Sequence, residues 1–129
     1  MSILDAWIKD LGFIKANFIG VKRYQFDSSA QGDSDVRIVS ICEIVTPPTR
    51  NEKHLHISGF GEKRAKKILS GFFNYDLMPP IVIEKLPDES QSSSEKYRLH
   101  DGYHRFYISK HLGMEEIPVI IKPSLLDDQ

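Results

Sequence analysis

Apolar residues recur at helical spacing in residues 61–73, where they follow the i, i+3, i+4, i+7 and i+8 pattern of an amphipathic helix. A shorter repeat of the same kind predicts a helix over 2–11. Residues 103–112 are apolar on most faces and end at Gly113, a residue typical of the position after a helix, so a third helix is predicted there. The apolar residues of the first pattern are Ala65, Ile68, Leu69, Phe72 and Phe73.

Runs of β-branched residues predict the strands. The longest covers 36–45 and stops before Pro47 and Pro48, because proline has no amide hydrogen to donate to a sheet. A looser alternation predicts a strand over 18–26, and the polar stretch 27–35 predicts a loop. Three further strands are predicted over 81–86, 97–99 and 117–121.

Together these elements predict an α+β fold. A small mixed β-sheet is expected from the segments 36–45, 81–86, 97–99 and 117–121. The helices over 61–73 and 103–112 are expected to pack on it.

The composition narrows the class of protein. The chain has 129 residues, of which 40% are hydrophobic and 27% charged, enough for a single domain over 1–129 with its own core. No apolar run approaches the roughly 20 residues of a membrane-spanning helix, so no membrane partner is expected. A formal net charge of −1 argues against a general DNA-binding protein, which needs many cations. The single cysteine, Cys42, excludes an internal disulfide, favours the cytoplasm, and lies in an apolar strand that predicts a buried, inert thiol.

The segment from Asp101 to Arg105 is the first candidate site. A strand enters a helix through Gly102, and such a turn presents unpaired N–H groups and the positive end of a helix dipole to an anion. His104 and Arg105 stand beside these groups and would supply most of the affinity, because hydrogen bonds to charged partners are stronger than the dipole effect. The alternative is an ordinary capped helix whose basic residues lie in solvent.

The helix over 61–73 carries a second candidate site. Lys63, Lys66 and Ser70 fall at i, i+3 and i+7 and form one stripe beside the apolar face. If this stripe lies near His104 and Arg105, it completes a cradle for a polyphosphate. The alternative is a solvated basic face.

Several motifs in order resemble the ParB/sulfiredoxin-like superfamily. They are Thr46-Pro47-Pro48-Thr49-Arg50, a helix before Pro79-Pro80-Ile81, the run Tyr97 to Arg105, Leu112-Gly113 and Ile117-Pro118-Val119. The resemblance covers about 36–123 and leaves 1–35 as an N-terminal extension.

This resemblance implies a nucleotide site. Family members hold phosphates at a Gly-x-His-Arg or Gly-Glu-Arg-Arg turn: ATP in sulfiredoxins, CTP in ParB proteins and adenine nucleotides in free-serine kinases. It therefore implies that a nucleotide (ATP, ADP or CTP) with Mg²⁺ binds here. The phosphate-binding residues that it implies are Gly102, His104, Arg105, Lys63, Lys66, Ser70 and Arg50.

Two departures from the family limit the function. Tyr103 stands where sulfiredoxins carry their catalytic cysteine, and a phenol with a pKa of about 10 cannot replace a thiolate, so sulfiredoxin activity is not expected. The chain ends six residues after Pro123, without the helix-turn-helix region of ParB proteins, so sequence-specific DNA partitioning is not expected either.

Three functional hypotheses follow. The first is an enzyme that hydrolyses a nucleotide or transfers its phosphoryl group to a small acceptor such as serine, with Glu43 or Asp101 as catalytic carboxylate. The second is a non-catalytic, nucleotide-gated module that contacts a protein partner through its N-terminal extension. The third, a ParB-like nuclease, has weaker support because only Asp101 lies near the turn. His54 and His56 lack the partners of a zinc site, so no structural metal is predicted.

Overall fold

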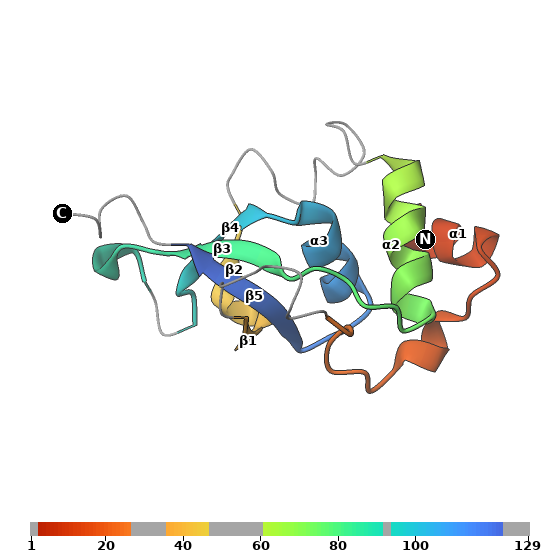
Figure 1. Cartoon of the computed structure of the whole chain (residues 1–129), viewed down its shortest axis with the longest axis horizontal. Helices are drawn as coiled ribbons and strands as arrows, with labels where there is room; N and C mark the ends of the chain where they lie inside the picture. Colours follow the sequence, from red (N-terminus) through yellow and green to blue (C-terminus); the bar gives the residue numbers. More distant parts are fainter. Residues whose placement is uncertain (1–2, 27–35, 47–60, 92–93, 123–129) are drawn as a thin grey trace.

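The computed structural model describes residues 3–26, 36–46, 61–91 and 94–122 (Figure 1). Predicted helices and strands other than those over 18–26 and 36–45 are confirmed, with boundaries that differ by at most two residues. The elements, with η for a 3-10 helix, are α1 (Ile3–Asp10), η1 (Lys15–Phe18), β1 (Arg37–Ser40), η3 (Ile41–Glu43), β2 (Ile44–Val45), α2 (Glu62–Phe73), β3 (Ile81–Lys85), η6 (Asp88–Ser90), β4 (Tyr97–Asp101), α3 (Tyr103–His111) and β5 (Glu116–Lys122).

The strands form one mixed sheet in the order β1-β5-β3-β4-β2. β1 pairs with β5, and β3 with β4, in antiparallel orientation. β3 pairs with β5, and β4 with β2, in parallel. The predicted α+β class with a mixed sheet is therefore confirmed. β3 is the central strand, and its Ile81 and Ile83 are fully buried.

The predicted strand over 36–45 is one strand in the sequence but two in the structure. The 3-10 turn η3 divides it, so that β1 lies at one edge of the sheet and β2 at the other. The four Cα-to-Cα steps from Ser40 to Ile44 span at most about 14 Å, whereas five flat strands would place the two edges about 19 Å apart. The sheet must therefore curl, and Cys42, on the turn, is exposed rather than buried as predicted.

The three helices lie one after another on one side of the sheet (Figure 1). Figure 1 shows α3 next to the sheet, α2 beyond α3, and α1 against the far side of α2. The buried side chains of all three helices and of the sheet form one hydrophobic cluster. This arrangement places the β4–α3 connection close to one side of α2.

The segment 18–26, predicted as a strand, forms no strand. Its pairing is limited, among the described residues, to an isolated bridge between Phe26 and Met78. The apolar positions instead carry aromatic rings that pack on α2: Tyr24 stacks on Phe72 with ring centroids 4.7 Å apart, and Phe18 meets Phe73 edge to face at 4.9 Å. Side-chain packing, rather than sheet pairing, explains the alternation in the sequence.

The first helix joins the same core. Leu4, Trp7 and Ile8 on α1 belong to the cluster that also contains β3 and α3 residues. His111, in the last turn of α3, lies 2.7 Å from Asp5 through Nε2 and Oδ1. Residues 3–26 therefore pack as part of the domain that holds the sheet.

Tyr24 gives a testable pH dependence. Its hydroxyl donates a hydrogen bond of 2.7 Å to the Pro79 carbonyl, and burial raises the pKa of Tyr24 well above its usual value against an opposing effect of Arg105. The stabilisation is present below pH ~10, where an unfolded tyrosine titrates, and is lost as the pH rises above that value. We expect Tyr24→Phe to cost about 1 kcal/mol at pH 7 but to lose less stability than the wild type above pH ~10.

Urea denaturation of both proteins from pH 7 to 11 checks this expectation. Tyr75→Phe serves as the matched control, because the side chain of Tyr75 is largely exposed. It should retain the alkaline loss of the wild type. Equal alkaline losses in Tyr24→Phe and the wild type would contradict the argument.

Candidate functional site

The turn between β4 and α3 has the geometry expected of an anion site. β4 ends at Asp101, Gly102 adopts the left-handed conformation with φ 99° and ψ 34°, and α3 begins at Tyr103. No side-chain hydrogen bond caps this helix end in the described part of the chain. Because the first N–H groups of a helix lack intrahelical acceptors, they remain available to a negatively charged group.

The turn borders a cavity of about 550 Å³ between α2 and α3. Cationic, apolar and acidic side chains all contribute to its wall. The lining residues are Arg64, Lys67, Ile68, Gly71, Asp76, Leu77, Met78, Asp101, Gly102, His104 and Arg105. The structure thus brings four predicted residues of the turn, Asp101, Gly102, His104 and Arg105, to one hollow.

Gly102 is required by the fold of this turn. A Cβ at this position would lie 2.7 Å from Cγ2 of Ile81, a fully buried side chain of β3, and 3.1 Å from Nη2 of Arg105. The backbone therefore approaches β3 more closely than any residue with a side chain permits.

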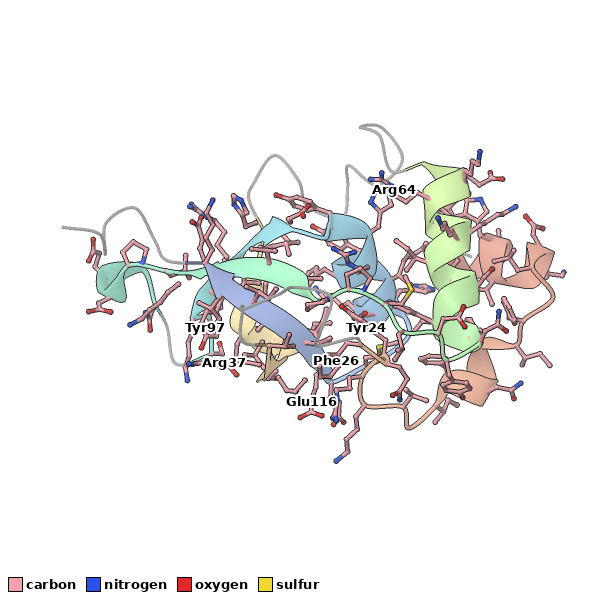
Figure 2. All side chains as sticks on the ribbon, in the orientation of Figure 1. Tyr24, Phe26, Arg37, Arg64, Tyr97 and Glu116 are labelled. Atoms are coloured by element: carbon pink, nitrogen blue, oxygen red, sulfur yellow. The ribbon has the colours of Figure 1, made fainter. Side chains whose placement is uncertain are left out.

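The wall formed by α2 differs from the predicted one. The predicted stripe of Lys63, Lys66 and Ser70 is absent from the lining of the cavity. In its place stand Arg64 and Lys67, at i and i+3 of the same helix. Figure 2 shows Arg64 projecting from the first turn of α2 on the side of α3.

Lys66 faces α1 instead of the cavity. Its Nζ lies 3.1 Å from a Glu62 carboxylate oxygen and 3.6 Å from one of Asp10. The hydrogen bond to Glu62, with further attraction from both carboxylates, holds the pKa of Lys66 above its usual value. The expected contribution of Lys66 to this cavity is therefore corrected, because α1 packs on the flank of α2 that carries Lys66.

Arg105 brings an incompletely satisfied guanidinium to the site. Its Nε is buried and has no hydrogen-bond partner among the described residues. A buried guanidinium N–H without an acceptor is costly, so a bound anion would relieve this deficit. The opposing effect of Arg105 on the pKa of Tyr24 places its charge close to that ring as well.

The segment after α2 supplies lining residues that the sequence did not suggest. α2 ends in a Schellman motif, in which the N–H of Tyr75 donates to the Phe72 carbonyl and that of Asp76 to the Gly71 carbonyl. Tyr75 takes the left-handed conformation with φ 59°, which costs a non-glycine residue about 1 kcal/mol. The absence of a glycine after Phe73 hid this cap in the sequence.

The two predicted catalytic carboxylates lie at different places. Asp101 lines the cavity at the end of β4. Glu43 is not among the lining residues, and it pairs instead with Lys96, 3.4 Å away, just before β4 begins. The five residue-to-residue steps of extended chain from Lys96 to Asp101 correspond to about 16 Å. The structure does not bring Glu43 to this cavity.

The donor set fits Mg²⁺ only together with phosphates. The described residues contain no group of three or more histidine, cysteine or acidic side chains that would hold a metal by themselves. Mg²⁺ usually binds through one or two carboxylates plus phosphate oxygens, and Asp101 lines the cavity beside the β4–α3 turn. Arg50, predicted to close the cradle, lies outside the described residues, as do His54 and His56.

Comparison of the sequence with protein families matches residues 27–129 to the ParB N-terminal domain. The chain belongs to this family. The match begins after the segment 3–26 that packs on α2. It confirms the resemblance to the ParB/sulfiredoxin-like superfamily that the motifs around Gly102 indicate.

Two solved structures share the fold of this ParB N-terminal domain. Sulfiredoxin from Arabidopsis thaliana superposes with a TM-score of 0.50 at 16% identity, over 70% of this chain and 86% of that one. Chromosome-partitioning protein ParB from Caulobacter crescentus, C-terminally truncated and complexed with CTP-gamma-S, superposes with a TM-score of 0.51 at 17% identity. That alignment covers 70% of this chain and 45% of that one. At identities of 16% and 17%, both likenesses concern the fold alone.

No curated protein sequence matches the chain. Among the described residues, no helix combines the length and apolarity needed to cross a bilayer.

Proposed function

We propose that the cavity between α2 and the β4–α3 turn binds the phosphate groups of a nucleotide. The observation that carries this proposal is that Arg64, Lys67 and Arg105 line the same cavity as Gly102, at the uncapped start of α3. Backbone N–H groups and guanidinium groups are the donors that proteins use for phosphate oxygens. The buried Nε of Arg105, without an acceptor among the described residues, gives an anion a reason to bind there.

The comparisons support a nucleotide rather than a simple anion. The ParB of Caulobacter crescentus, which has this fold, was crystallised with CTP-gamma-S. The cavity of about 550 Å³ lies in the size range of small-molecule sites. ATP, ADP and CTP, each with Mg²⁺ held by phosphates and a carboxylate, are the candidate ligands.

Turnover is a second, separate hypothesis. Asp101 is the predicted catalytic carboxylate that lines the cavity, and it stands next to the glycine of the phosphate turn. From there it can orient a water or a hydroxyl acceptor, and phosphoryl transfer needs positioning and charge stabilisation rather than a covalent nucleophile. Sulfiredoxin chemistry is not proposed, because the residue at this turn is Tyr103, which has no thiol. The exposed Cys42 lies on η3 and does not line the cavity.

The non-catalytic alternative assigns the same cavity to regulation. Ile14 and Ile19 of the N-terminal segment are 63% and 82% exposed and offer apolar contacts to a protein partner. Incubation with ATP or CTP, Mg²⁺ and serine separates the two hypotheses. Release of the nucleoside diphosphate by the wild type, and its loss in Asp101→Asn, would support an enzyme. Tight nucleotide binding without any product would support a gated module.

A thermal-shift and calorimetric screen tests the binding proposal. A nucleotide at 100 times its Kd should stabilise the protein by about 2.7 kcal/mol, which raises the melting temperature by several degrees. We expect Arg64→Ala to weaken binding about 10-fold or more, because it removes a charged hydrogen-bond donor.

Arg37→Ala is the matched control for this screen. Both arginines are exposed, but Arg37 lies on β1 and Figure 2 shows it at the sheet end of the molecule, away from Arg64. It should bind nucleotide like the wild type. Equal affinities in Arg64→Ala, Arg105→Ala and the wild type would exclude phosphate binding at this cavity.

A further inference from the structure

The cavity changes chemical character along the axis of α2. Arg64 and Lys67 line it from the first half of the helix, whereas Ile68 and Gly71 line it from the second half. At 1.5 Å per residue, Arg64 and Gly71 are separated by about 10 Å along the axis. The cations therefore occupy one end of the α2 wall, and small or apolar residues occupy the other.

The chain after α2 completes the apolar end of the cavity. Leu77 and Met78 both line it. Gly71 allows the Met78 thioether to lie against the helix, because a Cβ on Gly71 would be only 2.8 Å from Sδ of Met78. An apolar surface with a polarizable sulfur packs favourably against a planar aromatic ring.

Asp76 adds one carboxylate to this apolar end. Its N–H donates to the Gly71 carbonyl at 2.8 Å, so the Schellman motif holds its backbone beside the cavity. Within the described segments, the salt bridges formed by lysine, arginine and histidine do not include its carboxylate. An ionised carboxylate only accepts hydrogen bonds, and it repels phosphate. Asp76 therefore suits a donor group on the part of the ligand that carries no phosphate.

We propose that Asp76 selects nucleotides whose base carries an exocyclic amino group. The amino group donates a hydrogen bond to the Asp76 carboxylate while the ring packs on Ile68, Leu77 and Met78. A keto oxygen at the same position of the ring would place an acceptor against an acceptor, which disfavours that base. This inference rests on the proposed nucleotide binding and adds its specificity.

Two pairs of nucleotides test the selection. ATP and ITP, like CTP and UTP, differ in having an amino or a keto group at the same ring position. In titration calorimetry we expect the wild type to bind the amino member of at least one pair about 10- to 100-fold more tightly. Asp76→Asn offers both a donor and an acceptor, so the preference should shrink to about threefold or less.

Asp88→Asn is the matched control, because Asp88 is an exposed aspartate of η6 that does not line the cavity. It should keep the preference of the wild type. Far-UV circular dichroism of both variants verifies that the fold is intact.

The outcomes separate this inference from the function on which it rests. Equal wild-type affinities within both pairs overturn the role of Asp76 but leave nucleotide binding in place. A preference that survives in Asp76→Asn overturns it as well. The role of Asp76 in base selection is also overturned if Asp76→Asn removes only a preference for ribonucleotides over 2′-deoxy nucleotides. Asp76 would then contact the ribose and not the base. Failure of all four nucleotides and of inorganic tripolyphosphate to bind overturns both proposals.

Discussion

Gly102→Ala should lower the melting temperature of the protein by roughly 10 °C and abolish nucleotide binding. The new methyl group would lie 2.7 Å from Cγ2 of Ile81, which is fully buried in the central strand. Overpacking of this kind costs about 1–3 kcal/mol, and a left-handed alanine adds about 1–2 kcal/mol. For a domain of this size, the summed loss of stability corresponds to a fall in melting temperature of roughly 10 °C. Relief of the clash would also move the N–H groups at the start of α3 away from the phosphates.

Gly113→Ala provides the matched control for Gly102→Ala. Gly113 also has a positive φ, of 82°, but a Cβ there would meet no atom within 4 Å. Gly113→Ala should therefore lose only the stability that a left-handed alanine costs, about 1–2 kcal/mol, and bind nucleotide like the wild type. Scanning calorimetry and nucleotide titration measure both effects. If the two variants lose equal stability, the close approach to Ile81 does not determine the turn.

Phe72→Ala should destabilise the whole domain by about 3–5 kcal/mol, the usual cost of removing a buried aromatic ring. Phe72 is 2% exposed on α2, and Tyr24 stacks on it at 4.7 Å with an interplanar angle of 16°. The substitution removes one of the α2 rings on which the N-terminal segment packs. We therefore expect the N-terminal segment and the sheet to lose stability together.

Two probes can follow this loss separately. Trp7 on α1 is the single tryptophan of the chain, so its fluorescence reports the N-terminal segment, whereas far-UV circular dichroism reports the domain as a whole. In urea, the midpoints of both signals should fall together in Phe72→Ala. A fluorescence transition that separates from the circular dichroism transition would show that the N-terminal segment unfolds independently of the rest of the domain, contrary to the single domain predicted from the sequence.

Much of the fold was predictable because the relevant signals are local. The apolar period of 61–73 matches α2, and the glycine at 113 marks the end of α3. The aromatic residues of 18–26 misled the prediction, because alternating rings suit both a strand and a segment packed on a helix. The division of 36–45 was also missed, since the β-branched composition continues through the turn η3.

The candidate site was predictable in part. The motif from Asp101 to Arg105 contains its own turn, because Gly102 between a strand and a helix sets the direction of the chain. The predicted stripe on α2 does not line the cavity, whereas Arg64 and Lys67 of the same helix do. Both flanks of the apolar face carry basic residues, and helical periodicity does not distinguish Arg64 and Lys67 from Lys63 and Lys66. Asp76 was missed because its cap lacks the usual glycine.

By itself, therefore, the amino-acid sequence determined the helices, most strands and the turn between β4 and α3, since these depend on residue type and on spacing within a few positions. Only the tertiary structure decided which side of α2 meets α3 and which meets α1. It also placed β1 and β2 at opposite edges and brought Asp76 to the cavity that Gly102 borders. These outcomes depend on contacts between segments far apart in the chain, where several packings bury the same apolar residues and the fit of the whole core selects one.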